Sequence, residues 1–333
     1  METLGIPCLI TAYRRLDLVT QLLKNIAPSG PRLVYLSIDG PKNPQDAQDQ
    51  QDALKEVVEA ASESKIEIKI LHRAQNRGLA AAIISSLDWF FEHEIAGAIL
   101  EDDSLPTESF FDWIKFANEN FRNETEILIY SGHQFFPKEN PPNALSWVNY
   151  PVIGAWGTTR EKWHVLRKLL LETHQNFGQK QSFNSHQFWK GGKMRCEAGL
   201  VDSWAIPLAE GMRSNNYLSV LPPVNLVINA GDDDRAIHTS RFLPEYFKTS
   251  TEFGDFGKLL LLLNYENVHK NNKLFESIVY NIRFHHFLLP IRVRLQLLAR
   301  KFFGGRIYSL QERVKLAESD LLNPQLFTRN DIK

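Results

Sequence analysis

Apolar and polar positions form two kinds of block along the first hundred residues. Short apolar runs, each typical of a buried strand, occur at Pro7–Thr11, Leu33–Asp39, Ile66–His72 and Ala96–Leu100. Between them, apolar residues recur with the spacing of one helix face at about residues 15–27, 46–63 and 78–94. The runs return roughly every 30 residues, the length of a βαβ unit. The pattern therefore predicts a Rossmann-like α/β fold with a mostly parallel sheet flanked by helices.

The middle of the chain predicts further elements in a less regular order. Helices are expected from Thr107 or Ser109 to about Phe121, from Arg160 to about Thr173, and from Asp202 to about Arg213. Strands are expected at Ile127–Ser131, Leu218–Leu221 and Val224–Asn229. The proline- and asparagine-rich residues 137–151 and the polar residues 174–199 are predicted to be loops, the second of them mobile and close to a site.

From about residue 241 the pattern predicts a helical C-terminal region, so the expected domains are 1–240 and 241–333. Residues 283–306 carry six cations and no acid, at Arg283, Arg292, Arg294, Arg300, Lys301 and Arg306. Such a segment is typical of a helix that contacts anionic lipid at the membrane surface. The alternative is a helical appendage whose apolar face packs on the sheet domain and whose arginines are solvated.

Composition narrows the class of protein. The chain has 333 residues, 43% of them hydrophobic and 23% charged, as expected for a globular protein. The formal net charge of -1 gives no field that would attract nucleic acid, so no nucleic-acid partner is expected. Cys8 and Cys196 do not form a disulfide framework, and no signal peptide or membrane-spanning run is predicted. We expect a cytoplasmic protein, with peripheral contact at the inner face of a membrane if residues 283–306 bind lipid.

An acidic triplet, Glu101-Asp102-Asp103, directly follows the fourth apolar run. It is expected at the carboxyl edge of the sheet, where open α/β folds bind their ligands. Three adjacent carboxylates repel one another, so they need a cation or a set of donors. Hard oxygen ligands favour Mg²⁺ or Mn²⁺, which commonly bridge one or two carboxylates to the phosphates of a substrate. A short acidic run is also typical of a solvated loop. The residues at the other strand ends have to decide between a metal–phosphate site and a solvated loop.

The first two strands also end in residues suited to a nucleotide. Thr11 and Tyr13, together with Arg14, offer a hydroxyl, an aromatic ring and a cation, which can meet a ribose, a base and a phosphate. Arg14 alone is equally typical of the start of a helix. Asp39 precedes Gly40 and Pro41, so it is either a turn former or an acceptor for an N–H group of a nucleotide base.

The third strand leads into Asn76-Arg77-Gly78, a tight turn before a helix. A helix N-terminus favours an anion, and Arg77 there fits a diphosphate, although a solvated arginine is the alternative. No Gly-x-Gly-x-x-Gly or P-loop pattern follows any strand, which argues against a dinucleotide oxidoreductase and a P-loop enzyme. Neutralisation of phosphate would then fall on a metal ion at the acidic triplet.

The four strand-end motifs together resemble those of nucleotide-sugar glycosyltransferases of the GT-A fold. Thr-Ala-Tyr-Arg, Ile-Asp-Gly-Pro, Asn-Arg-Gly-Leu and Glu-Asp-Asp occur in that order, and the likeness is nearest to the family 2 and N-acetylglucosaminyltransferase I types. It covers about residues 5–240. Each motif alone is weak, and their order makes the signal fairly specific.

The resemblance implies a role for most of the candidate site residues. Asp103 would bind Mn²⁺ or Mg²⁺ on the diphosphate of the donor, and Asp102 would lie toward the ribose. Asp39 would contact the base, typically uracil, and Thr11 with Arg14 would line the nucleotide pocket. His238 matches a histidine that several relatives add to the metal or diphosphate, although a lone histidine is more often structural.

An inverting transferase also needs a carboxylate that takes the proton of the acceptor hydroxyl. Asp202, in Val-Asp-Ser-Trp, resembles the acid-plus-tryptophan segment that holds this base, and capping of the following helix is the alternative. Asp232-Asp233-Asp234 is a rival that a turn explains as well. The usual paired Glu-Asp base motif of family 2 is not plain in this chain. Trp156 could stack on a sugar ring or pack in the core.

The sequence therefore predicts a metal-dependent inverting glycosyltransferase with a nucleotide-sugar donor, for which the resemblance implies a UDP-sugar. The expected acceptor is a hydroxyl of a glycan, a lipid-linked sugar or a protein, with the synthesis of surface polysaccharide or glycan as the expected role. A non-catalytic nucleotide-sugar-binding protein is the alternative of another class. A nucleotidyltransferase on a similar sheet is a further alternative, although its glycine-rich first loop is missing.

Overall fold

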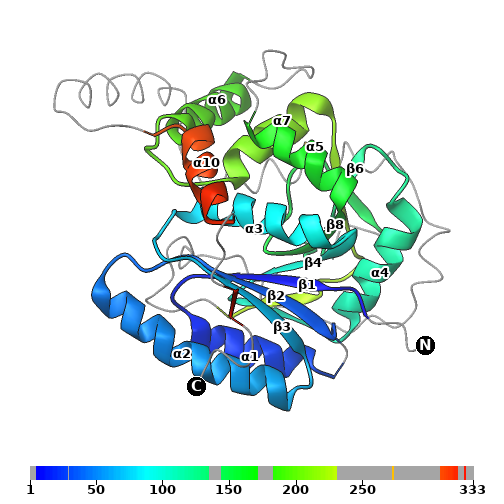
Figure 1. Ribbon diagram of the computed structural model, residues 1–333. Helices are drawn as coiled ribbons and strands as arrows, with labels where there is room; N and C mark the ends of the chain where they lie inside the picture. The colour runs from blue at the N-terminus through cyan, green and yellow to red at the C-terminus, as the bar shows by residue number, and fades with distance from the viewer. Residues whose placement is uncertain are drawn as a thin grey trace, which may run out of the picture.

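A nine-stranded sheet forms the centre of the computed structural model, with helices on both of its faces (Figure 1). The structure describes residues 5–28, 30–134, 144–171, 183–230, 272–273, 308–321 and 326–327. The strands of the sheet are β1 (Cys8–Ala12), β2 (Leu33–Ile38), β3 (Glu67–His72), β4 (Ala96–Glu101), β6 (Ile127–Ser131), β7 (Ser146–Val148), β8 (Ala155–Thr159), β9 (Leu218–Leu221) and β11 (Leu326–Phe327). A separate two-stranded sheet pairs β5 (Ser104–Pro106) with β10 (Val227–Asn229).

The strand order is β11-β3-β2-β1-β4-β8-β6-β9-β7. The four strands β3, β2, β1 and β4 are all parallel to one another, and β6 and β9 run in the same direction. The three strands β11, β8 and β7 run the opposite way. The prediction of a mostly parallel, Rossmann-like sheet flanked by helices is therefore confirmed.

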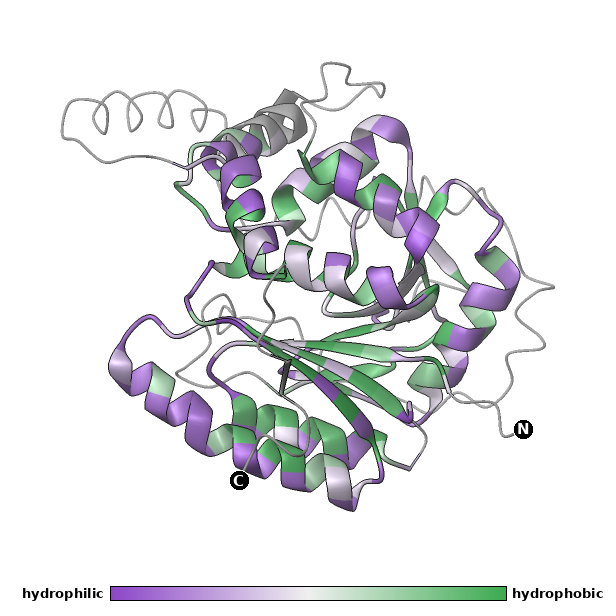
Figure 2. Cartoon of the chain, viewed as in Figure 1, coloured by the Kyte–Doolittle hydropathy of each residue, from purple (hydrophilic) through white to green (hydrophobic). Residues whose placement is uncertain are grey.

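The described helices divide between the two faces of the sheet. They are α1 (Leu16–Ile26), α2 (Pro44–Glu63), α3 (Leu79–His93), α4 (Ser109–Phe121), α5 (Arg160–Leu171), α6 (Phe183–Glu197), α7 (Ala205–Asn215) and α10 (Leu310–Leu321). Helices α1, α2 and α4 share one apolar cluster with the sheet, and α3, α5, α7 and α10 share the other. Figure 2 shows that the strands are largely hydrophobic and that α2, on the outside, is largely hydrophilic. None of the described helices has the length and apolar content needed to cross a bilayer.

The predicted elements of the first hundred residues agree with the structure to within a few residues. The strands at Ile127–Ser131 and Leu218–Leu221 are also confirmed, as are the helices predicted near 109–121 and 160–173. Four short strands were not predicted: β5 directly after the acidic triplet, β7 within the predicted loop 137–151, β8 at residues 155–159, and β11 in the C-terminal region. Only the last half of the strand predicted at Val224–Asn229 forms, as β10.

The prediction of a loop at residues 174–199 is wrong for its second half, which forms helix α6. The sequence of α6 has no apolar face with helical spacing and contains two adjacent glycines, so periodicity does not reveal it. Tertiary packing explains the helix: Phe188, Trp189 and Cys196 are buried, and α6 packs on α7. A Cβ atom at Gly192 would lie 2.9 Å from the Ile206 side chain, so a glycine lets the two helices approach.

The C-terminal region predicted at 241–333 is described only at residues 272–273, 308–321 and 326–327. Helix α10 is present there and packs on α3, and β11 pairs antiparallel with β3. The described part of this region is therefore attached to the sheet rather than separate from it. The basic residues 283–306 lie outside the described residues.

Lys162 on α5 fastens the end of α4 to the sheet. Its buried ammonium group donates to the carbonyl oxygens of Phe121 and Glu124, at 2.8 Å each, and to that of Ile127. Carbonyls at the C-terminus of a helix have no partner within the helix, so an ammonium group can satisfy several of them at once. Burial lowers the pKa of Lys162 to about 8.

We expect Lys162→Met to lower the free energy of unfolding by about 2–3 kcal/mol, because buried carbonyl groups lose their donor. Urea titration followed by circular dichroism measures the change. Lys115→Met, at an exposed position on α4, is the matched control and should change the value by less than about 0.5 kcal/mol. Equal effects of the two substitutions would show that Lys162 does not stabilise the junction between α4 and β6.

Candidate functional site

The ends of β3, β2, β1 and β4 lie next to one another at one edge of the sheet. Ala12 pairs with Ile38, Ile38 pairs with His72, and Thr11 pairs with Glu101. The polar segments that follow these strands are therefore neighbours. The chain moves outward from β1 through β2 to β3 and then returns to the other side of β1 for β4. Open α/β sheets bind ligands outside such a change of direction, between the ends of β1 and β4.

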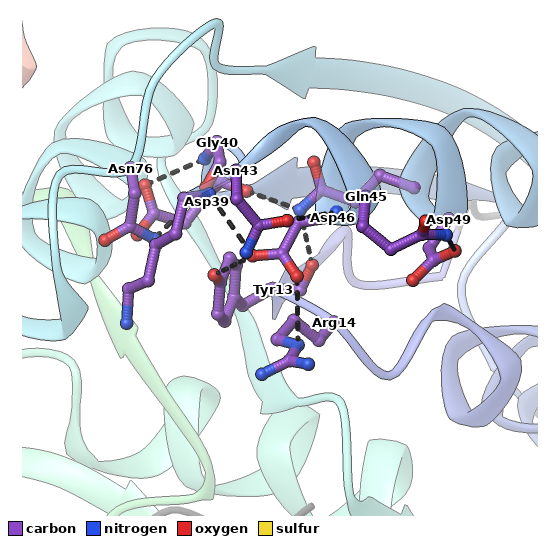
Figure 3. A network of polar contacts seen from close by, with 11 residues as sticks. Tyr13, Arg14, Asp39, Gly40, Asn43, Gln45, Asp46, Asp49 and Asn76 are labelled. Carbon is purple, nitrogen blue, oxygen red and sulfur yellow. Dashed lines mark hydrogen bonds and ion pairs between the residues drawn. The ribbon is translucent and has the colours of Figure 1, made fainter.

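The carboxylate of Asp39 is the centre of a polar network at the end of β2 (Figure 3). Oδ1 accepts from the backbone N–H groups of Gly40 at 2.9 Å and Arg77 at 2.8 Å. Oδ2 accepts from the Asn76 side-chain amide at 2.8 Å and from the backbone of Gly78 at 3.2 Å. Asp39 and Asn76, both predicted to bind the nucleotide-sugar donor, are thus hydrogen-bonded to each other.

The network leaves little room for other side chains. Asp39 is 6% exposed, and burial raises the pKa of its carboxyl while the N–H donors of Arg77 and Gly40 oppose that rise. A Cβ atom at Gly40 would lie 2.3 Å from the backbone of Gln75, so the glycine is required by the close approach of two loops. The turn that the sequence suggested at Gly40 is therefore also a packing contact.

A buried cation lies behind this network. The guanidinium of Arg73, 2% exposed, donates to the hydroxyls of Ser37 and Ser85 at 2.7 Å each and has no carboxylate within hydrogen-bond distance among the described residues. Burial lowers the pKa of Arg73 to about 10. Its charge lowers the pKa of Asp39, so it favours the ionised carboxylate on which the loop depends.

Tyr13 and Arg14 follow β1 and meet the start of α2. The Tyr13 hydroxyl donates to Asp46 Oδ2 at 2.8 Å, and Arg14 lies 3.6 Å from Oδ1 of the same carboxylate (Figure 3). Burial, with this hydrogen bond, raises the pKa of Tyr13 to about 12. The Arg14 side chain is 61% exposed, and Lys42 Nζ lies 5.2 Å from the centre of the Tyr13 ring. An aromatic ring with two cations beside it is suited to a base or an anionic ligand.

The acidic triplet has an internal counter-ion that the sequence analysis did not select. Arg15 Nη2 donates to Asp102 Oδ1 at 2.5 Å and to Asp103 Oδ2 at 2.9 Å. The three side chains are 15%, 10% and 12% exposed. Predictions from the sequence chose Arg14, but in the structure its neighbour Arg15 faces the acids.

The two carboxylates offer the hard oxygen ligands that a divalent cation such as Mg²⁺ or Mn²⁺ prefers. Oxygens of adjacent residues converge on one cationic nitrogen, which is the donor chemistry that Mg²⁺ or Mn²⁺ uses when phosphates complete its shell. Within the described part of the chain, no three His, Cys, Asp or Glu side chains gather as a self-sufficient metal group. The described residues of this site would therefore hold a metal only together with a ligand.

Burial makes the first two acids of the triplet reluctant to ionise. It raises the pKa of Glu101 to about 8, with the neighbouring Asp103 adding to the rise. It raises the pKa of Asp102 to about 6, and the charge of Arg15 opposes that rise. Shifts of this kind are concentrated at functional sites, although ion-pair networks also produce them.

Asp202, the predicted catalytic base, lies at the N-terminus of α3. Oδ2 accepts from the Leu79 backbone at 2.6 Å, and Oδ1 accepts from Ala80 at 3.2 Å. Arg313 Nη1 of α10 lies 2.5 Å from Oδ1. Asp202 therefore caps a helix, but not the one predicted: at the start of α7, which follows it in sequence, the Ile206 N–H donates to Ser203 Oγ at 3.4 Å. Its carboxylate is half-exposed and beside Gly78.

Arg77 is also held by α10. Its Nε and Nη2 donate to the two oxygens of Asp320, at 2.8 and 2.5 Å, in a bidentate pair. Both partners are about one-fifth exposed. The sequence predicted that the N-terminus of α3 and Arg77 bind a diphosphate. In this structure Asp202 contacts the helix N-terminus, and Asp320 pairs with Arg77.

Two other predicted site residues are Trp156, which is buried in the core, and His238, which lies outside the described residues. Trp156 on β8 is 1% exposed and packs against Trp204, so its ring has no face open to a sugar and the core-packing alternative describes it. His238, the second predicted metal ligand, lies outside the described residues, as does Asp232-Asp233-Asp234. Thr11 lies in β1, where its hydroxyl contacts the Leu100 carbonyl at 3.5 Å.

His133 is a buried polar residue near the triplet that the sequence analysis did not select. It follows β6, and a Cβ atom at Gly154 would lie 3.2 Å from its Nε2. The Gly154 carbonyl in turn accepts from the Glu101 backbone at 2.9 Å. Burial lowers the pKa of His133 to about 4, against a hydrogen bond with Asn225. Its place directly after the predicted strand 127–131 is the signal that could have identified it.

We expect Gly78→Ala to destabilise the fold by about 1–3 kcal/mol, because φ is +82° and ψ is 160°, a region that only glycine adopts readily. The new Cβ would also lie 2.5 Å from Asp202 Oδ2. Asp202→Ala should cost about 1 kcal/mol through loss of the cap. In a double-mutant cycle by urea titration, the combined effect should be smaller than the sum. Additive effects would show that Gly78 and Asp202 do not touch in solution.

We expect His133 to make the protein less stable in acid. Its pKa is about 4 in the folded state and near 6.5 in the unfolded chain, so the unfolded chain binds more protons as the pH falls from 6.5 to 4. The loss should reach about 3 kcal/mol over that window. Urea titrations of His133→Gln should show a correspondingly smaller loss, whereas His164→Gln, at an exposed position, should behave like the natural protein. Identical acid profiles for all three proteins would contradict the burial of a neutral His133.

Comparisons with known proteins assign no family. No family model matches the chain, and no curated protein matches it in sequence. Among solved structures, the chain is similar to a crystal structure of UDP-glucose pyrophosphorylase complexed with UDP-glucose, at 12% identity and a TM-score of 0.37. The match covers 66% of this chain and 90% of that one. A likeness at this level decides neither the fold nor the activity of this chain.

Proposed function

We propose that the protein is an inverting glycosyltransferase of the GT-A type that takes a nucleotide-sugar donor and a hydroxyl acceptor. One observation supports this above the others. The four strand ends that carry the glycosyltransferase-like motifs are adjacent, at the carboxyl edge of a parallel sheet and beside its change of direction. An oxyanion-rich diphosphate meets cations and N–H donors at such an edge.

The nucleotide lies across the ends of β1 and β2 in this proposal, and uridine is the expected nucleoside. Tyr13 offers an aromatic face beside Arg14, and Thr11 with Asp39 lines the floor. Because both Asp39 oxygens already accept N–H groups of its own chain, we expect Asp39 to shape the pocket through Asn76 and the 76–78 loop as much as to contact the base. Arg77 would be shared between Asp320 and the diphosphate.

A divalent ion, Mn²⁺ or Mg²⁺, would be held by Asp103 with Asp102 beside it, and by His238 if residues outside the described part approach them. The ion would neutralise the departing nucleoside diphosphate. The chain's own contribution is to hold the diphosphate in a dry, cation-lined edge and to orient the acceptor. The acceptor hydroxyl belongs to a glycan, a lipid-linked sugar or a protein in this proposal.

Asp202 remains the proposed proton acceptor. Its half-exposed carboxylate lies beyond the end of β3, and it is placed firmly by two N–H groups and Arg313. Firm placement is what a general base needs, because proton transfer requires hydrogen-bond distance to the acceptor hydroxyl. A carboxylate has about four lone-pair positions, so Oδ2, which accepts from Leu79, can also accept the hydrogen of the acceptor hydroxyl.

The decisive experiment is titration calorimetry of the protein with UDP and UDP-sugars, with and without Mn²⁺. We expect binding that is strengthened by Mn²⁺, and thermal-shift screening across nucleotide sugars should identify the donor. Asp202→Asn should keep donor binding and lose turnover by about 100-fold or more. Asp112→Asn, at an exposed position on α4, should change neither.

Each other outcome has a definite meaning. Binding of nucleotide sugars without any turnover by the natural protein would favour the non-catalytic binding protein. Release of pyrophosphate from a nucleoside triphosphate and a sugar phosphate would favour the nucleotidyltransferase. Absence of binding to every nucleoside diphosphate and nucleotide sugar, with Mn²⁺ present, would end the proposal.

A further inference from the structure

Two consecutive arginines at the end of β1 have opposite surroundings. Arg14 is 61% exposed and faces Asp46 at 3.6 Å. Arg15 is 15% exposed, and its Nη2 lies between the carboxylates of Asp102 and Asp103 at 2.5 and 2.9 Å. Arg15 is thus the group that now neutralises the two acids proposed to hold the metal.

A metal ion and Arg15 cannot occupy this position together. Both carboxylate oxygens point to one nitrogen atom. A Mg²⁺ or Mn²⁺ ion bound to those oxygens at about 2.1 Å would overlap the space that Nη2 fills. Two cationic centres that close would also repel strongly at a poorly hydrated site. Binding of the metal to both oxygens therefore requires the guanidinium to move away.

Arg15 also has donor capacity that the described residues do not use. Its Nη1 is buried and has no hydrogen-bond partner among them. An unsatisfied buried N–H group of a cation costs free energy that an anionic ligand would recover. Guanidinium groups bind phosphate through paired N–H groups, so a diphosphate at the end of β1 is a suitable acceptor for this group.

We propose that Arg15 is an exchangeable internal cation of the donor site. It neutralises Asp102 and Asp103 while the site holds no metal, and it leaves them when a divalent ion binds. Released from the acids, it binds the diphosphate of the donor. This second step rests on the proposed function, whereas the exchange between Arg15 and the metal does not. The consequence is that metal and nucleoside diphosphate bind cooperatively, because each favours the displaced arginine.

The first test measures Mn²⁺ binding alone, by the loss of the electron paramagnetic resonance signal of free Mn²⁺. Arg15→Met should bind Mn²⁺ about tenfold or more tightly than the natural protein, because the competing guanidinium is gone. Arg32→Met, at an exposed position before β2, is the control and should leave Mn²⁺ binding unchanged. Equal Mn²⁺ affinity in all three proteins would overturn the proposal.

Arg15→Met leaves two partly buried acids without their partner, so it could fail to fold, and a second test uses the natural protein. Phenylglyoxal modifies accessible guanidinium groups, and fragmentation mass spectrometry distinguishes Arg15 from Arg14. Saturating Mn²⁺ should raise the modification rate of Arg15 several-fold, and UDP added with Mn²⁺ should lower it again. Arg32, exposed before β2 and outside the proposed site, should react at a constant rate. An unchanged Arg15 rate at saturating Mn²⁺ would overturn the exchange.

The two arms separate this inference from the proposed function. A response of Arg15 to Mn²⁺ without any effect of UDP would support the exchange and contradict the diphosphate contact. Donor binding and sugar transfer by the natural protein, with an Arg15 rate indifferent to Mn²⁺, would support the proposed function and contradict the exchange.

Discussion

The buried carboxylate of Asp39 joins the strand ends on which the candidate site depends. It accepts four N–H groups, one from its own turn and three from the loop after β3. Because Gly78 ends that loop and starts α3, the carboxylate also fixes where the helix begins. The buried charge of Arg73 behind it favours the ionised form. A carboxylate buried with this many donors is stable only when the loop is folded around it, so β2, β3 and α3 meet at this edge as one unit.

The sheet could be predicted from the sequence because each of its first four strands, and each helix between them, has a clear pattern within its own segment. Four apolar runs at regular intervals, separated by helical patterns, require parallel strands with crossover helices, and these connections restrict the topology. The short strands β7 and β8 and the helix α6 could not be predicted in the same way. They are formed by contacts with distant parts of the chain, such as the approach of α6 to α7 through Gly192, and periodicity within a segment does not report such contacts.

The site could be predicted to the level of the strand end, but not of the individual side chain. Asp39, Asn76, Asp102 and Asp103 lie at the predicted edge, yet of two adjacent arginines the sequence analysis chose the one that faces Asp46. Neighbouring residues after a strand point in different directions, and only the backbone of the turn decides which faces the acids. Asp202 illustrates the same limit, since it caps a helix that is distant in sequence.

A common feature of this edge is that several of its charged side chains already have an opposite charge of the chain beside them. Arg15 pairs with Asp102 and Asp103, Arg14 with Asp46, Arg77 with Asp320, and Asp202 with Arg313. A charged ligand at such a site exchanges partners instead of meeting bare charges, which avoids the cost of isolated charges in a poorly hydrated place. Two of these counter-charges, Arg313 and Asp320, belong to α10. The C-terminal helix is therefore part of the electrostatics of the site, because a ligand that binds Arg77 or Asp202 meets a side chain that α10 already contacts.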